Sequence, residues 1–390
     1  DSVAWWAGEY KMKGFRFDLM GVIDTATMRK VKDTLYDIDP EIVVYGEGWT
    51  GGGSHASSPS DIANVYAKLR DEGKGSVGVF NDCGRDGMKG NTTWANVTPT
   101  TGNFLDSLAP SSNSIYNAAT MYIGENRDRK NSGLATPPEM TVNYISCHDN
   151  YTLYDQLNYQ LNGLSSSGVD HLNAIEATVA STAMLLSGEG IAFIHGGEEI
   201  FRTKLMKRGD PLFDQFVDTY GAASDGTSSW IAGDGIEIDE DTWLVRNSYM
   251  WGDAVNSYKW DRKYQYKQYF DKYAEAIHAR NELIEEGYLG HSESEVNSGA
   301  ASLLSTIRDG LPAMGAKFLN EDGGEVISLL SGRAIGGNIT MPLGPEVSKG
   351  TYQIIYSSSL NRQGETINLS DAIELSRFEA LILRYQGGNL

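Results

Sequence analysis

The sequence has very little cysteine. Cys83 and Cys147 are its only two cysteines, and they lie far apart. Their separation fits neither a zinc-binding motif nor a disulfide framework. A small domain stabilised by zinc or by several disulfides is therefore excluded. We interpret both residues as small, buried apolar side chains. The redox compartment of the protein is left open by this composition.

Long apolar runs are also missing. No stretch is long and apolar enough to cross a membrane. No signal peptide stands before the first segment with a structured pattern. The sequence begins at Asp1 without an initiator methionine, so the lack of a targeting segment says nothing about export.

Positive charge is in the minority. The chain has 32 Lys and Arg against 52 Asp and Glu, which gives a formal net charge of −20 and a pI near 4.7. Such a surface repels nucleic acid and anionic membranes, so neither is expected as a partner. The acidic residues are spread along the chain and form no tail, which is typical of a solvated surface.

Aromatic residues are abundant. With 390 residues and 40% hydrophobic residues, the chain can bury one large core and a second, smaller one. The 21 Tyr and 8 Trp suit neutral ligands with polar rims, such as sugars, because an aromatic face covers the apolar face of a pyranose. The alternative for any single ring is a place in the core.

The first 290 residues alternate short apolar runs with amphipathic stretches. Strands separated by helices predict right-handed βαβ units around a parallel sheet. Asp24 has the position of a helix cap. The predicted strands are Gly14–Met20, Ile42–Gly46, Val77–Asn81, Thr141–Cys147 and Gly190–His195, and the predicted helices are Asp24–Tyr36, Asp61–Asp71, His171–Leu186 and Tyr264–Glu286.

After about Asn297 the pattern changes to short strands separated by Gly, Ser, Asn and Pro. This pattern predicts a small antiparallel β-sandwich, and therefore an α/β unit over 1–290 and an all-β domain over 295–390. The predicted strands are Glu325–Leu330, Gly337–Met341, Thr351–Tyr356, Glu365–Leu369 and Phe378–Tyr385; Thr50–Ser60 and Leu164–Gly168 are predicted loops, and Leu205–Thr242 is a predicted excursion.

Acidic and polar side chains follow several of the predicted parallel strands. Arg16 and Asp18 are two residues apart and share a face of the first strand, and Glu47 ends the second. The fourth strand runs into His148, Asp149 and Asn150. Because the carboxyl ends of the strands in a parallel barrel meet at one face, these side chains are expected to converge there.

Such a convergence has a use in glycoside hydrolysis with retention, which needs a carboxylate nucleophile and a second carboxyl group as acid and base. Arg16 would favour the ionised form of Asp18, and Glu47 would need a raised pKa. His148 and Asp149 would hold sugar hydroxyls and favour an oxocarbenium-like transition state. The alternative for a single acid at a strand end is a helix cap or a surface group.

Five segments in this order resemble the α-amylase superfamily of (β/α)8-barrel glycoside hydrolases, family 13, and within it the type I pullulanases. The similarity covers roughly the first 290 residues. The segments that carry it are Gly14–Gly21, Tyr45–Trp49, Phe80–Gly90, Val142–Leu153, and Gly196–Glu199 together with Arg202–Lys204, Asn247–Tyr249 and Asp253–Asn256.

The resemblance implies a role for each catalytic candidate. Asp18 would be the nucleophile, Glu47 the general acid/base and Asp149 the stabiliser of the transition state. Arg16 and His148 would hold the nucleophile and the sugar at the cleavage point.

Further candidates would bind the substrate. The ring of Trp49 would lie on the leaving-group side, with rim packing as its alternative. Asn150 would contact sugar beside Asp149, and Asp253 and Asn256 would line the other side of the cleft. His195 is interpreted as a packing residue with polar support from Glu198; the other histidines, His55, His171, His278 and His291, are interpreted as surface or structural residues.

The activity implied is hydrolysis of α-1,6 branch linkages in pullulan, starch or glycogen, with no organic cofactor. Ca²⁺ often stabilises barrels of this kind, but no liganding loop can be read here, so no metal ligand is assigned. The alternatives are another α-glucan hydrolase or transglycosylase of the superfamily, or a glucan-binding half that is inactive alone. A polymeric substrate favours secretion or display at the cell surface.

One departure from the family is large. An earlier family segment, an Asp-Val-Val-Tyr-Asn-His-like strand, has no counterpart, and Ser2–Tyr10 resembles the helix before the fourth barrel strand. The expected fold is therefore a partial barrel of strands 4–8 followed by the β-sandwich. Because a partial parallel barrel leaves strand edges uncovered, we expect a second polypeptide or a preceding segment of the chain to complete it.

Overall fold

The computed structural model describes residues 1–49, 76–90, 99, 101–127, 135–162, 172–210, 213–214, 235–249, 251–307, 310–334, 336–360, 362 and 364–387. The predicted loops Thr50–Ser60 and Leu164–Gly168 and the predicted helix Asp61–Asp71 lie outside these residues. In the part that is described, no helix has the length and apolar character needed to cross a bilayer.

A parallel sheet of five strands, counted over the described residues, is formed by the N-terminal half of the chain. Its order is β1-β2-β3-β6-β7 and every pairing is parallel. The strands are β1 (Gly14–Phe17), β2 (Val43–Gly46), β3 (Gly78–Phe80), β6 (Thr141–Asn143) and β7 (Ile191–Ala192). The sheet and the helices between its strands confirm the predicted partial barrel. Each strand is shorter than predicted: β6 ends at Asn143 and β7 at Ala192, for example, although apolar residues follow both.

Helices lie between and around these strands. Asp24 caps α2 as predicted, since its carboxylate accepts a hydrogen bond from the amide of Thr27 at 2.8 Å. The helices are α1 (Ser2–Tyr10), α2 (Thr25–Ile38), α4 (Asp82–Lys89), α5 (Ser112–Ala119), α6 (Leu153–Asn162), α7 (Leu172–Leu186), α9 (Asp253–Asn256), α10 (Asp261–Gln265), α11 (Lys267–Glu285) and α12 (Glu293–Asn297), with 3₁₀ turns η1 (Met20–Val22), η2 (Thr120–Ile123), η4 (Pro138–Met140) and η5 (Glu198–Ile200).

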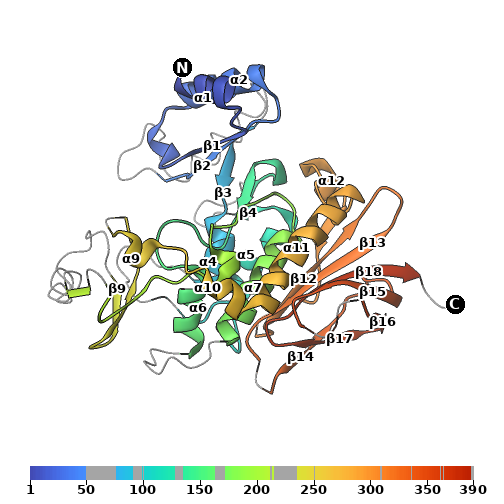
Figure 1. Cartoon of the computed structure of the whole chain (residues 1–390). Coiled ribbons are helices and arrows are strands. Elements are labelled where there is room, and N and C mark those ends of the chain that lie inside the picture. Colours follow the sequence, from blue (N-terminus) through green and yellow to red (C-terminus); the bar gives the residue numbers. More distant parts are fainter. Residues whose placement is uncertain are drawn as a thin grey trace.

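The C-terminal part is antiparallel. A sheet in the order β11-β12-β13-β18-β15-β16 packs against the pair β14-β17 over a shared apolar cluster that includes Ile327, Met341 and Leu375 (Figure 1). The strands are β11 (Ala301–Leu303), β12 (Ala313–Leu319), β13 (Glu325–Ser331), β14 (Asn338–Pro342), β15 (Gly350–Ser357), β16 (Thr366–Leu369), β17 (Ala372–Ser376) and β18 (Ala380–Gly387). Strand β12 is not among the predicted strands, because it is buried on both faces and shows no alternation.

The largest apolar cluster joins the two parts of the molecule. Helix α7 is buried along most of its length and packs against α6 and α11 on one side and against β13 and β18 on another. The same cluster contains Met184 from α7, Leu283 from α11 and Phe318 from β12. The division at about residue 290 therefore stays a prediction, since the apolar core continues across it.

The predicted excursion contains a small antiparallel sheet of its own, in the order β8-β10-β9. Its strands are β8 (Leu205–Lys207), β9 (Gly235–Asp239) and β10 (Thr242–Val245); a separate pair is formed by β4 (Asn126–Arg127) and β5 (Ala135–Thr136). After β10, residues Arg246–Tyr249 return to the edge of the barrel.

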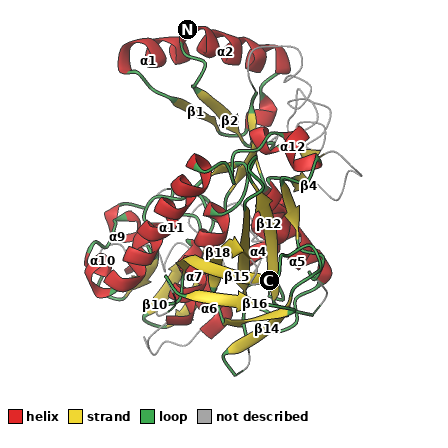
Figure 2. Cartoon of the chain, turned by 90° about the vertical axis from the view of Figure 1, so that its right-hand side faces the viewer, coloured by secondary structure: helices red, strands yellow, loops and turns green. Residues whose placement is uncertain are grey.

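The unit α1-β1-α2-β2 lies at one end of the molecule and is joined to the rest through β3 (Figure 2). Its own cluster includes Met20, Met28 and Leu35. At Gly46 an added Cβ would lie 2.5 Å from the Phe17 carbonyl oxygen, so the two strands meet as closely as only glycine permits. Among the described residues, no strand pairs with the outer edge of β1 or of β7.

Candidate active site

The carboxyl ends of the parallel strands bring the predicted acids to one edge of the sheet. Asp18 follows β1, Glu47 follows β2, and the turn His148–Asn150 follows β6. All three acids are linked through two cationic side chains, Arg16 and His148.

Arg16 bridges the first two acids. Its Nη1 lies 2.6 Å from Asp18 Oδ1 and its Nη2 lies 2.9 Å from Glu47 Oε1. Burial alone would lower the pKa of Arg16, but the hydrogen bond to Asp18 and the charges of Glu47 and Asp18 outweigh burial and raise it. Arg16 also lies over the ring of Phe80, 5.5 Å from its centroid. One guanidinium group therefore holds both carboxylates close together.

The two carboxylates have different surroundings. The Asp18 side chain is 59% exposed and that of Glu47 is 14% exposed. Burial raises the pKa of Glu47, and the charges of Asp18 and Asp149 raise it further against the opposing effects of Leu19 and Arg16. The Leu19 amide donates to Glu47 Oε2 at 3.0 Å from a backbone with φ 44°, a conformation that a branched residue rarely adopts.

His148 connects the third acid. Its Nε2 lies 3.7 Å from Asp18 Oδ1 and 3.3 Å from Asp149 Oδ1. A hydrogen bond with the Cys147 side chain raises the pKa of His148, burial opposes this, and the charge of Asp149 adds to it. The imidazole between the two carboxylates therefore stays protonated to a higher pH than an isolated histidine does.

The remaining predicted residues lie around this cluster. Asn150 has φ 63°, and its amide donates to Asn247 Oδ1 at 2.8 Å. Trp49 is 47% exposed, two residues after Glu47, and its carbonyl accepts from the amide of Gly21 at 3.1 Å. About half of Trp49 is therefore accessible to solvent.

Asp253 and Asn256 belong to α9. Asp253 is exposed at the start of the helix. Asn256 accepts a hydrogen bond from Ser248 Oγ at 2.7 Å and one from Arg202 Nη2 at 3.3 Å. Neither residue makes a hydrogen bond or ion pair with the three acids in the described part of the chain. Their sequence spacing gave no means to place them relative to those acids.

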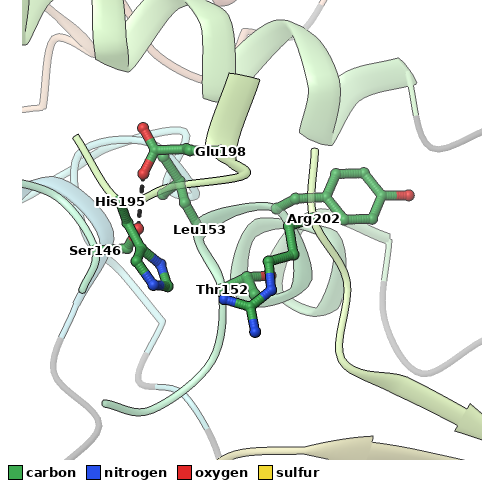
Figure 3. Close-up of a pocket in the computed structure, with 7 residues that line it drawn as sticks. Ser146, Thr152, Leu153, His195, Glu198 and Arg202 are labelled. Carbon is green, nitrogen blue, oxygen red and sulfur yellow. Dashed lines mark hydrogen bonds between the residues drawn. The ribbon is translucent and has the colours of Figure 1, made fainter. Parts of the chain in front are cut away.

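A pocket lies behind the strand ends, between β6 and β7, and its lining includes Ser146, His195, Glu198 and Arg202 (Figure 3). The buried Glu198 carboxylate accepts hydrogen bonds from Ser146 Oγ at 2.7 Å, Thr182 Oγ1 at 2.9 Å and Tyr273 OH at 3.1 Å. The backbone amide of Glu198 donates a hydrogen bond to the backbone carbonyl of His195 at 3.0 Å. Burial, together with nearby cations, lowers the pKa of His195 to about 4, so this ring is neutral near pH 7.

Two contacts of the site come from residues to which the sequence assigns no role. The hydroxyl of Tyr249 donates to Asp149 Oδ1, and the ammonium of Lys204 donates to the carbonyls of Asn150 and Arg246. Tyr249 and Lys204 fall within segments that carry the resemblance, which was the only signal for them. Their contacts join parts of the chain about 50 to 100 residues apart, beyond the reach of local spacing.

The prediction that both cysteines are buried is wrong. In the part of the chain that the structure describes, neither Cys83 nor Cys147 forms a disulfide, and both are half-buried. Cys83 lies in the first turn of α4 and Cys147 in the turn after β6, so both are at strand ends and outside the closed layers. Among the residues that the structure describes, no group of His, Cys, Asp and Glu side chains is arranged to hold a metal ion.

Comparison with known proteins finds relatives of one kind, although no family model matches the chain. The pullulanase of Bacillus subtilis (strain 168) is 26% identical over 268 residues, which is 69% of this chain and 30% of that enzyme. The pullulanase of Klebsiella pneumoniae is 29% identical over 246 residues, 53% of this chain and 21% of that enzyme.

The chain is a homologue of the pullulanases, within the α-amylase family. Its fold agrees with this relationship: a crystal structure of the pullulanase from Anoxybacillus sp. LM18-11 complexed with maltotetraose superimposes with a TM-score of 0.67 at 23% identity, over 98% of this chain and 45% of that one. The pullulanase-related chain thus spans less than a third of the two enzymes matched by sequence and less than half of the one matched by fold.

Proposed function

We propose that the pullulanase-related chain supplies the catalytic carboxylates of a retaining glycoside hydrolase that cleaves α-1,6 branch linkages in pullulan, starch or glycogen. The observation that carries this proposal is the Arg16 guanidinium, shared between an exposed Asp18 and a largely buried Glu47 with a raised pKa. Retention requires one ionised and one protonated carboxyl group, held roughly 5–5.5 Å apart.

The first chemical step would use both groups. Asp18 attacks the anomeric carbon and forms a glycosyl ester, while the protonated Glu47 gives its proton to the departing glycosidic oxygen. In the second step Glu47 takes a proton from water, and the resulting hydroxyl attacks the anomeric carbon and releases Asp18. Both steps conserve atoms and charge and need no cofactor.

The surrounding residues would favour the positively charged transition state and hold the sugars. Asp149 supplies negative charge to the oxocarbenium-like centre, and His148 donates to a sugar hydroxyl. Trp49 offers an aromatic face to the leaving-group side, and Asn150 contacts the sugar beside Asp149. Asp253 and Asn256 would line the opposite side of the cleft.

The substrate class is supported by the relatives, whose names specify pullulan cleavage and one of which was crystallised with maltotetraose. The unpaired outer edges of β1 and β7 in the described residues support a further proposal. Another stretch of polypeptide, from a longer form of this chain or from a second chain, would pair with them and close the barrel.

Pullulan digestion with product analysis tests the proposal, and the intact mass of the purified protein shows whether a second polypeptide accompanies it. We expect maltotriose to be released, and we expect Asp18→Asn and Glu47→Gln each to abolish release without unfolding the protein. Glu365→Gln, an acid of the C-terminal sheets, is the matched control and should stay active.

Full activity in both site variants would disprove the mechanism. A protein that binds malto-oligosaccharide but releases nothing, with only the 42.7 kDa chain present, would instead favour a glucan-binding half that needs its complement.

A further inference from the structure

The loop Arg246–Tyr249 lies against the turn that carries Asp149. The hydroxyl of Tyr249 donates to Asp149 Oδ1 and lies 3.3 Å from Asn247 Oδ1. Asn247 Oδ1 also accepts from the amide of Asn150 at 2.8 Å. Two side chains of the loop, Asn247 and Tyr249, are therefore hydrogen-bonded to two consecutive residues of the turn.

Lys204 fixes the two segments to each other. Its ammonium donates to the carbonyl of Asn150 in the turn and to the carbonyl of Arg246 in the loop, and the side chain is buried with 2% of its surface exposed. The Lys204 amide donates to the buried Asp155 carboxylate at 2.7 Å, which anchors the lysine to α6. The exposed contact between Tyr249 and Asp149 thus lies beside a set of buried and part-buried polar contacts that hold the loop against the turn.

These contacts give the two carboxylate oxygens of Asp149 different surroundings. Oδ1 receives the Tyr249 hydroxyl and faces His148 Nε2 at 3.3 Å. No residue in the described part of the chain donates to Oδ2, so this oxygen is the one left to meet a ligand. A carboxylate bound at one oxygen by a phenol cannot rotate without losing a charge-assisted hydrogen bond.

We propose that Tyr249 is a positioning residue that fixes the Asp149 carboxylate in the orientation required by the transition state. The proposal rests on the role proposed above for Asp149. Because the benefit arises where positive charge develops on the sugar, Tyr249 acts on turnover more than on substrate binding.

The test is Tyr249→Phe, which removes the hydroxyl and keeps the ring. In pullulan hydrolysis we expect kcat to fall about tenfold, the loss that corresponds to about 1.4 kcal/mol, while KM changes less than about twofold. Tyr264→Phe is the matched control, since Tyr264 is 77% exposed on α10, and it should keep wild-type kinetics.

A binding measurement makes the test independent of turnover. Calorimetry with 1-deoxynojirimycin, a cationic sugar mimic, should show about tenfold weaker binding to Tyr249→Phe, while neutral maltotriose should bind it as it binds wild type. Equal affinity of both proteins for the cationic probe would overturn the proposal. So would an equal loss for both probes accompanied by a lower melting temperature, because that pattern marks a purely structural role.

The two proposals fail in different ways. If the wild-type protein releases no maltotriose, the proposed function fails, yet the contrast between the two probes still decides the role of Tyr249. If the wild-type protein is active and Tyr249→Phe matches it in kcat and in binding, only the positioning role fails.

Discussion

Glu47 is the residue on which the proposed chemistry depends most. Its carboxyl is screened from water while the neighbouring Asp18 is open to it, although both touch the same guanidinium. The acidic neighbours Asp18 and Asp149 add to the effect of burial, so the raised pKa of Glu47 arises from the arrangement of the whole cluster.

This arrangement predicts a pH dependence of stability. A carboxyl whose pKa is higher in the folded than in the unfolded state weakens the fold as pH rises, beginning above the unfolded value of about 4.3. Glu47→Gln carries no such charge. We therefore expect this variant to melt above wild type at pH 7, with the difference shrinking to nothing near pH 4.

Calorimetry at several pH values measures this difference, and Glu365→Gln serves as the control. A Glu47→Gln protein that is less stable than wild type at neutral pH would contradict the raised pKa. The expected outcome also means that the proposed acid is kept at the expense of stability.

Part of this cluster could be predicted from the sequence. Arg16 lies on β1 and Asp18 directly follows it, and the carboxyl ends of parallel strands meet, so their approach to Glu47 and Asp149 follows from local rules. The left-handed backbone of Leu19 and the hydroxyl of Tyr249 could not be predicted. The first depends on close packing between strands, and the second depends on a contact across 100 residues.

At the scale of elements, the approach of β1 to β2 determines where Asp18 and Glu47 lie. Gly46 stands directly before Glu47, and an added Cβ would meet the Phe17 carbonyl oxygen at 2.5 Å and Met20 at 2.9 Å. The backbone oxygen cannot move aside without parting the strands.

We expect Gly46→Ala to destabilise the protein by about 1–3 kcal/mol and to reduce activity, because overpacking at this point displaces β2. Gly8→Ala is a matched control in the interior of α1, where nothing lies within 4 Å of the added Cβ. It should instead stabilise by about 0.5–1 kcal/mol. Urea denaturation of the two variants measures whether stability falls in Gly46→Ala and rises in Gly8→Ala. A Gly46→Ala protein as stable as wild type would refute the close contact.

The elements themselves were largely predictable, because apolar runs and amphipathic stretches alternate regularly along the barrel part. The ends of the strands were not predictable, since the apolar residues Tyr144 and Ile145 follow directly after β6 ends at Asn143. Strand β12 shows the opposite difficulty: burial on both faces removes the alternation by which a strand is recognised.

At the scale of the whole molecule, one ion pair joins the barrel part to the segment that leads into the sheets. His291 Nδ1 lies 2.6 Å from Glu189 Oε1, and the amides of Gly290 and His291 donate to Glu189 Oε2 at 2.9 and 3.1 Å. The hydrogen bond to Glu189 raises the pKa of His291, burial opposes this, and the charges of Glu189 and Glu295 add to it.

The direction of this shift predicts a second pH effect. The stabilisation by protonated His291 is complete below the unfolded pKa of about 6.5 and is lost as pH rises through the higher folded value. We expect His291→Asn to be less stable than wild type at pH 6, with the difference becoming smaller towards pH 9. The difference in melting temperature between the variant and wild type at each pH removes the contribution of the other titrating groups. A difference that stays constant with pH would disprove the role of the ion pair.

The way the two parts share a core has a consequence for evolution. Met184, Leu283 and Phe318 come from α7, α11 and β12 and meet in one cluster, so the helices of the barrel part and the antiparallel strands complete each other's interior. A cut near residue 295 would expose that interior on both pieces. We therefore expect the C-terminal sheets to be inherited together with the barrel helices they cover, and not to be exchanged between genes as an independent module.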